Sequence, residues 1–250
     1  MVHPLHLLTM QNSDIGPMGF VGEHVYRRGA TVDEVMPQEG DPLPASHAPY
    51  DGAIVLGGTM DAFDDARNPQ FQPMIELLRG FHRAEKPILG ICLGAQLVAR
   101  VFDKPVYRHA ELEVGFTEVE ITEAGARSPL LSGAARRQWV MEWHQDTFDL
   151  PEEAELLVTG SRCPNQAFRI GQHVYAFQFH FEATTPLLRS WVKAANPAAL
   201  AKSHPHFLPE FEPALARHMP AQTALARQIA NGWLDLVEAR AAAQQLAKAG

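Results

Sequence analysis

The amino-acid sequence predicts an α/β protein with an open, mainly parallel sheet, helices on both faces and an antiparallel extension. Short apolar runs alternate with segments of helical periodicity over about the first 100 residues, a pattern typical of strand–helix–strand units. From about residue 105 the expected strands become half-polar, as in strands with one solvated face. Hydrophobic residues make up 46% of the 250-residue chain, so a sizeable packed core is expected.

Four segments in the N-terminal half are expected to be strands. LHLLTM (5–10), GAIVLGG (52–58) and PILGICL (87–93) are apolar runs of strand length, and residues 30–37 show strand-like alternation. Because helical segments separate most of these runs, we expect their strands to lie parallel in one sheet.

Two helices are expected between these strands. The segment 16–29 has Pro17 near its start and Gly29 just past its end, as helix boundaries often do. The segment 71–86 carries apolar side chains at the spacing of one helical face, namely Phe71, Met74, Ile75, Leu78 and Phe81. Both helices are therefore expected to pack against the sheet.

The second half of the chain is expected to extend the same sheet. Residues 106–122 and 137–148 resemble half-exposed strands, and 173–184 returns to a core pattern. No flexible linker interrupts them, so we expect residues 1–196 to form one α/β domain. Residues 197–250 are expected to be a helical extension packed on that domain, with 221–250 as the longest helix.

Charge and cysteine content restrict the class of protein. The net charge of -8 argues against a nucleic-acid or anionic-membrane surface. No apolar run has the length of a membrane span, and the N-terminus lacks the basic flank of a signal peptide. Only Cys92 and Cys163 occur, without metal-ligand spacing, which favours a reducing cytoplasm over a disulfide framework.

The stretch Gly90-x-Cys92-x-Gly94 has the spacing of a nucleophile elbow. A residue on a tight strand-to-helix turn is held in a strained backbone conformation, and glycines two positions away on either side relieve the crowding. The thiol would then lie near a helix N-terminus, where unpaired N–H groups favour the thiolate. The alternative is a buried structural cysteine beside packing glycines.

A cysteine nucleophile needs a base and a group that orients the base. His180 and Glu182 occur together where the expected strand 173–184 ends, and ligands of open α/β sheets bind at such strand ends. A carboxylate beside the imidazole would fix its tautomer and stabilise the imidazolium. A single histidine among the twelve would more often be structural, but the pair favours a catalytic role.

These motifs resemble those of class I glutamine amidotransferases. GICLGAQ followed by FHFE is similar to the family's triad signature, and the similarity extends over roughly residues 50–185, most closely to the glutaminase domain of GMP synthetase. The resemblance implies a flavodoxin-like three-layer fold without cofactor or metal. It also implies Cys92 as nucleophile, His180 as general base and acid, and Glu182 as the residue that orients His180.

Four further positions carry over from the resemblance. It implies that the backbone N–H groups of Gly58 and Leu93 form an oxyanion hole. The alternative for Gly58 is an ordinary turn at the end of a strand. It implies that Gln96 contacts glutamine, the alternative being a solvent-facing residue of the first helical turn. It places His144, in WHQDTF, at the border of the glutamine pocket; a structural hydrogen-bonding role is the alternative.

The sequence departs from the family at two positions and leaves the substrate open. Phe181 and Thr59 stand where the family usually has proline, and either change could alter the pocket. The chain has no Walker-type phosphate loop and no Ser-Gly-Gly-x-Asp-Ser segment. It could therefore release ammonia from glutamine for a synthetase partner chain, hydrolyse γ-glutamyl peptides by itself, or be a catalytically quiet binding protein. A redox or chaperone protein of the related superfamily would not be expected to pair the two motifs.

Overall fold

The computed structural model describes residues 4–249 and is built on a nine-stranded sheet with the order β2-β1-β3-β4-β9-β8-β7-β5-β6. The strands are β1 (His6–Asn12), β2 (Thr31–Val35), β3 (Gly52–Gly58), β4 (Ile88–Ile91), β5 (Val106–Ile121), β6 (Arg137–Phe148), β7 (Glu155–Gly160), β8 (Ala167–Ile170) and β9 (Val174–Phe177). The last residue of the helix expected over 221–250 lies outside the described residues.

The sheet changes direction at β9. Strands β2, β1, β3, β4 and β9 pair in parallel. From β9 onward, the pairs β9–β8, β8–β7, β7–β5 and β5–β6 are antiparallel. The expected fold class, a mainly parallel sheet with an antiparallel extension, is confirmed.

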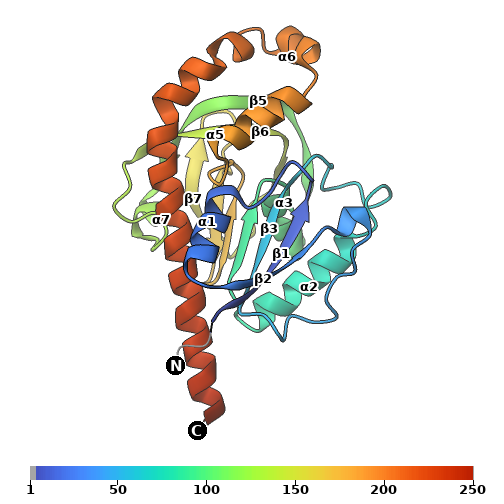
Figure 1. Ribbon diagram of the computed structural model, residues 1–250, viewed down its shortest axis with the longest axis vertical. Coiled ribbons are helices and arrows are strands. Elements are labelled where there is room, and N and C mark those ends of the chain that lie inside the picture. The colour runs from blue at the N-terminus through green and yellow to red at the C-terminus, as the bar shows by residue number, and fades with distance from the viewer. Residues whose placement is uncertain (1–3, 250) are drawn as a thin grey trace.

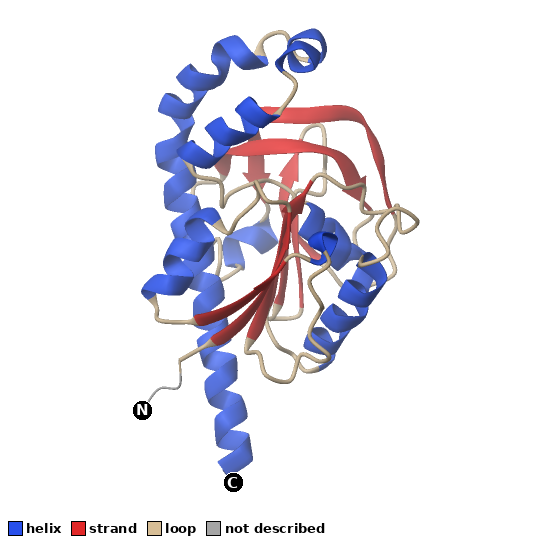
Figure 2. Cartoon of the chain, turned by 45° about the vertical axis from the view of Figure 1, so that its right-hand side comes forward, coloured by secondary structure: helices blue, strands red, loops and turns tan. Residues whose placement is uncertain are grey.

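Helices cover both faces of the parallel half, as Figures 1 and 2 show. The α-helices of the described chain are α1 (Gly19–Arg27), α2 (Phe71–Arg83), α3 (Leu93–Val101), α4 (Glu123–Arg127), α5 (Thr185–Ala194), α6 (Pro197–Ser203) and α7 (Phe207–Ala249). Side chains of α1 and the middle of α7 share one buried core with Leu7, Ile54 and Leu89 of the strands. Those of α2 and α3 share the other core with Leu8 and Val55. Since neighbours such as Leu7 and Leu8 point to opposite faces, the parallel strands are apolar throughout.

A third apolar cluster lies beside the antiparallel extension. It joins α5, α6 and the first turns of α7 to side chains of β5 and β6 such as Met141 and Phe116. In Figure 1, α7 runs along the length of the molecule, and its C-terminal turns extend beyond the sheet. Among residues 4–249, no helix is long and apolar enough to cross a membrane.

The structure differs from the expected elements in three places. The strand expected over 173–184 ends at Phe177, so the site residues that follow lie on a loop. Strands β7 and β8 and the short helices α4 and α5 were not expected. The C-terminal helix begins at Phe207 and continues through Pro213 and Pro220, although proline usually ends a helix. Buried side chains on both sides of Pro220, Met219 and Leu225, hold the helix in place through tertiary packing.

Candidate active site

Cys92 occupies a strained turn between β4 and α3. Its backbone has φ +52° and ψ −109°, a conformation that residues with a side chain rarely adopt. A Cβ added to Gly94 would lie 2.0 Å from the carbonyl oxygen of Val55, and one added to Gly90 would lie 2.8 Å from the carbonyl oxygen of Gly94. Only glycine fits at both flanks, so the spacing seen in the sequence is required by this turn.

Strand pairing brings His180 to the same edge of the sheet. Ile91 and Phe177 are paired in the parallel ladder of β4 and β9, and the Cys92 N–H donates to the Phe177 carbonyl at 2.8 Å. The residues that follow these two strands therefore leave the sheet side by side at its carboxyl edge. His180 Nδ1 lies 2.8 Å from Oε1 of Glu182, and the imidazole and the Cys92 side chain both lie against Gly57 at the end of β3.

The pKa of His180 reflects these two partners. Burial alone lowers the pKa, but the charges of Glu182 and Cys92 outweigh burial and raise it to about 10. The imidazolium is therefore the stable form at neutral pH. A protonated His180 beside Cys92 is suited to deliver a proton to a leaving group.

Backbone and side-chain contacts hold the His180 loop. The His180 N–H donates to the Met141 carbonyl at 2.8 Å, which ties the loop to β6. Gln222, fully buried on α7, accepts from the Met141 N–H at 2.7 Å and donates to the His180 carbonyl at 3.3 Å. The C-terminal helix thus contacts the His180 loop through Gln222, a residue that sequence reasoning did not single out.

The two residues expected in an oxyanion hole lie next to each other. Gly58 ends β3, and a Cβ there would lie 2.7 Å from the Leu93 side chain and 2.8 Å from Asn12. Leu93 opens α3, so its N–H is one of the first four that have no partner within the helix. A Cβ at Gly57 would lie 2.9 Å from Cε1 of His180. The double glycine therefore allows β3 to end directly against the candidate triad.

Gln96 is buried and lines the cavity in front of Cys92. Its Nε2 donates to the Asp146 carbonyl and to Oε1 of Gln178, both at 3.2 Å. The alternative of a solvent-facing residue is wrong, because the packing of α3 turns this side of the helix toward β6 and β9.

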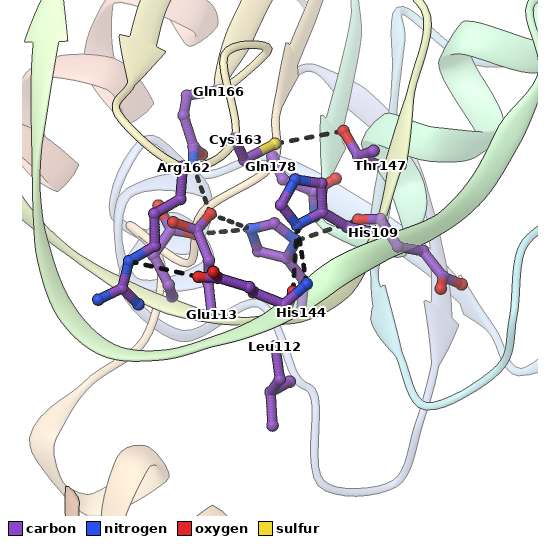
Figure 3. A network of polar contacts seen from close by, with 12 residues as sticks. His109, Leu112, Glu113, His144, Thr147, Arg162, Cys163, Gln166 and Gln178 are labelled. Atoms are coloured by element: carbon purple, nitrogen blue, oxygen red, sulfur yellow. Dashed lines mark hydrogen bonds and ion pairs between the residues drawn. The ribbon is translucent and has the colours of Figure 1, made fainter. Parts of the chain in front are cut away.

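His144 is held in a buried acidic cluster, shown in Figure 3. Its Nε2 lies 3.1 Å from Glu113 and 3.2 Å from Glu142, and its Nδ1 lies 3.0 Å from the Asp146 carbonyl oxygen. Burial lowers the pKa of His144, but the two carboxylates outweigh it and raise the pKa well above the usual value; burial also raises the pKa of Glu142. His144 lines the cavity, but both its nitrogens face protein groups.

The same cluster includes the second cysteine. Cys163 is fully buried and lies 3.2 Å from the Thr147 hydroxyl. The ligand atoms of Glu113, His144 and Cys163 lie within 4.8 Å of one another, a grouping that could hold a metal ion. No metal is expected from the sequence, and the close contacts between His144 and the carboxylates in Figure 3 already give these side chains protein partners.

A cavity of about 410 Å³ opens in front of Cys92. Of the seven expected residues, six line it, namely Cys92, His180, Glu182, Gly58, Gln96 and His144, whereas Leu93 is not among the lining residues. This volume lies within the range of roughly 300–1,000 Å³ found for small-molecule sites. The structure thus brings residues from β3, α3, β6 and the loop after β9 around one cavity.

Other residues of the cavity wall were not expected from the sequence. One group is polar: Arg108, Asp61, Gln145 and Asp146. Another is apolar and includes Trp143, Trp191 and Ile15. Arg108 belongs to a half-exposed strand with ordinary alternation, and the tryptophans have the pattern of core residues. Trp143, Gln145 and Asp146 belong to WHQDTF, the motif that could have indicated them.

Comparison with known proteins decides the family. The family model described as glutamine amidotransferase class-I matches residues 21–189. The chain belongs to this family. The matched range covers strands β2 to β9, the elbow and the His180–Glu182 pair, whereas β1, α6 and α7 lie outside it.

Individual relatives show different activities within the family. A glutamine amidotransferase-like protein of Salmonella typhimurium is 30% identical over 66% of this chain and 71% of its own length. A glutamine-hydrolysing GMP synthase subunit of Pyrococcus abyssi is 34% identical over 43% of this chain, and gamma-glutamyl peptidase 3 of Arabidopsis thaliana is 28% identical over 56%. The matches span 56% and 57% of those two relatives.

Solved structures share the fold over nearly the whole chain. A glutamine amidotransferase of Thermotoga maritima superposes with a TM-score of 0.82 at 25% identity, covering 94% of this chain and 99% of its own. A glutamine amidotransferase of Methylobacillus flagellatus has a TM-score of 0.79 at 23% identity, covering 94% and 95%. These proteins are similar in fold beyond the residues that the family model matches.

Proposed function

We propose that this chain hydrolyses the γ-glutamyl amide bond through a Cys92–His180–Glu182 triad. The observation that carries the proposal is the strained Cys92 elbow, which faces the His180–Glu182 pair in one cavity. Backbone strain of this kind persists where the surrounding structure enforces it, and it is concentrated at functional sites.

The chemistry proceeds in two steps. The Cys92 thiolate attacks the γ-carbonyl carbon, and the resulting oxyanion accepts hydrogen bonds from the N–H groups of Gly58 and Leu93. The C–N bond then breaks as His180 gives its proton to the leaving nitrogen, and a γ-glutamyl thioester remains on Cys92. His180 next removes a proton from water, which attacks the thioester carbonyl; the C–S bond breaks, glutamate is released, and the thiolate of Cys92 and the protonated His180 are restored. Glu182 keeps the imidazole in the required tautomer.

Glutamine is the first candidate substrate, with ammonia as the leaving group. The GMP synthase subunits among the relatives favour a synthetase partner chain that takes up this ammonia. We place the enzyme in the cytoplasm, where reducing conditions preserve its two free cysteines. In the wall of the site, Gln96 and His144 contribute to holding the glutamyl group.

A γ-glutamyl peptide or amide is the second candidate substrate. The observation that favours it is the cavity volume of about 410 Å³, which leaves room beyond the scissile bond for a larger amine than ammonia. The thioester step is the same for both substrates, so the two candidates differ only in the leaving amine.

Steady-state kinetics of the purified chain test the proposal. We expect Cys92-dependent release of glutamate from glutamine or from γ-glutamyl peptides. Cys92→Ala should abolish turnover, whereas the matched variant Cys163→Ala should retain activity within a few-fold, since Cys163 does not line the cavity. Equal losses of activity in folded Cys92→Ala and Cys163→Ala proteins would contradict the triad. So would the absence of turnover by the wild type, with or without a synthetase.

A further inference from the structure

The cavity has two chemically different groups of wall residues. The polar group is centred on Arg108, which lies 2.6 Å from Asp61, 3.2 Å from Asp146 and 3.0 Å from Gln145. Charged and hydrogen-bonding groups of this kind match the α-ammonium and α-carboxylate of a glutamyl head. Burying those charges away from polar partners would be unfavourable.

The apolar group consists of Ile15, Trp143 and Trp191, with Ala194 and Ala195 beside Trp191. The Trp143 and Trp191 rings meet edge to face with their centres 6.1 Å apart, and the Trp191 indole N–H donates to the Ile15 carbonyl. These contacts hold the two indoles in fixed positions. The group is therefore a preformed apolar surface.

His180 connects this apolar group to the proposed reaction. The centre of its ring lies 4.7 Å from the centre of the Trp191 ring. His180 must protonate the leaving nitrogen, so that nitrogen has to lie within hydrogen-bond distance of the imidazole. A substituent on the nitrogen would therefore begin next to Trp191, which leaves the polar group for the glutamyl head.

We propose that the Ile15–Trp143–Trp191 surface binds the substituent of the leaving amine, and that the preferred substrates are γ-glutamyl amides of uncharged, apolar amines. This inference rests on the proposed hydrolysis through Cys92. Arg108 is the only lysine or arginine among the described residues that line the cavity, and it belongs to the polar group assigned to the glutamyl head. A carboxylate on the leaving amine would thus find no lysine or arginine at the Ile15–Trp143–Trp191 surface.

A graded series of substrates tests this specificity. Glutamine, γ-glutamyl methylamide, γ-glutamyl isoamylamide and γ-glutamyl phenethylamide have leaving amines of similar basicity but increasing apolar size. Because one methylene in an apolar pocket changes kcat/KM by about 10- to 200-fold, we expect the isoamylamide and phenethylamide to exceed glutamine at least about tenfold. γ-Glutamyl-leucine, which adds a carboxylate to the isoamyl group, should be turned over more slowly than the isoamylamide.

Two tryptophans on the same face of β6 provide a matched pair of variants. Trp143→Ala removes part of the proposed surface and should lower the ratio of kcat/KM for the isoamylamide to that for the methylamide about tenfold or more. Trp139→Ala is the control, because Trp139 is 41% exposed, stacks on His218 and does not line the cavity. Ile15→Ala, on a half-buried loop residue, gives a second test if Trp143→Ala does not fold.

The outcomes separate the inference from the proposed function. Both proposals are supported if kcat/KM rises with the apolar size of the leaving amine. The isoamylamide-to-methylamide ratio of kcat/KM should then fall in Trp143→Ala or Ile15→Ala but not in Trp139→Ala. Cys92-dependent hydrolysis in which glutamine is preferred, or a ratio unchanged in a folded Trp143→Ala protein, would overturn the apolar-amine inference alone. If the wild type cleaves no member of the series in a Cys92-dependent manner, both proposals fail.

Discussion

Cys92 is one of three non-glycine residues with positive φ in the described part of the chain, and it is the one that lines the cavity. A strained residue of this kind costs of order 1–3 kcal/mol, and the rest of the structure must offset that cost. The hydrogen bond from its N–H to the Phe177 carbonyl and the first turn of α3 hold it in place from both sides. The strain therefore results from the way β4, β9 and α3 meet.

The protonation of His180 predicts how stability depends on pH. Its pKa is raised from 6.5 to about 10, so the folded state retains a proton that the unfolded state loses above pH 6.5. This stabilisation is fully present below pH 6.5 and is lost as the pH rises to about 10. Urea denaturation at several pH values should show the free energy of unfolding falling across this range.

Glu182→Gln is the control for this dependence on pH. The charge of Glu182 is the largest influence that raises the pKa of His180, so its removal should make the decline shallower. Groups elsewhere in the protein contribute equally to the pH dependence of both proteins. If the free energy of unfolding fell equally steeply with pH in the wild type and in Glu182→Gln, Glu182 would not be the residue that raises the pKa of His180.

Part of the site could be predicted from the sequence and part could not. The glycines around Cys92 and the short spacing of His180 and Glu182 are local signals, so they are visible in the chain. The acidic cluster around His144 is assembled from residues about thirty positions apart on paired strands, Glu113 of β5 with Glu142 and His144 of β6. No local pattern distinguishes such carboxylates from those of an exposed strand.

Elements are positioned by the contacts of single glycines as well as by apolar faces. Gly94→Ala should lower the free energy of unfolding by about 3 kcal/mol or more, since the added methyl would lie 2.0 Å from the backbone of Val55 and would push α3 away from β3. The measurement is the urea midpoint. Gly16→Ala is the control, with its nearest contact at an ordinary 3.5 Å and an expected change within about 1 kcal/mol. Equal losses of unfolding free energy in Gly94→Ala and Gly16→Ala would show that the close contact between Gly94 and Val55 does not determine stability.

Secondary structure was predictable where the apolar pattern was strong. The strands over 52–58 and 137–148 have the bounds that the pattern indicated, although 137–148 is mostly buried and not half-exposed as expected. Strands β7 and β8 are short, at 6 and 4 residues, and too short for periodicity to be informative. The early start of α7 depends on packing against α5, α6 and β6, which the sequence alone does not reveal.

At the scale of the whole molecule, α7 joins the sheet to the cluster around α5 and α6. This helix of 43 residues contributes side chains to the core that it shares with α1 and the sheet, and to the cluster around α5 and α6. Gln222 also ties it to the His180 loop. We therefore propose that residues 197–250 fold together with the α/β domain. Removing this helix would expose Ile54, Leu89 and the other side chains that share its core.

Trp233 tests the contribution of this helix to stability. It is fully buried against Gly52 at the start of β3, so Trp233→Ala should lower the free energy of unfolding by about 3–5 kcal/mol. Replacing Leu246, on the same helix but 76% exposed, with alanine should change the free energy of unfolding by no more than about 0.5 kcal/mol.

If the helix folds together with the α/β domain, circular dichroism and tryptophan fluorescence should report one coincident unfolding transition. Two separate transitions would show that the helix is an independent unit.

The covalent intermediate provides the most direct test of the central claim. The protein is mixed with a γ-glutamyl substrate, quenched in acid during turnover and analysed by mass spectrometry of its peptides. We predict a mass increase equal to one glutamyl group on the peptide that contains Cys92, and no increase in Cys92→Ala. Product formation without an adduct on Cys92, or with an adduct on Cys163, would contradict the assignment of Cys92 as the nucleophile.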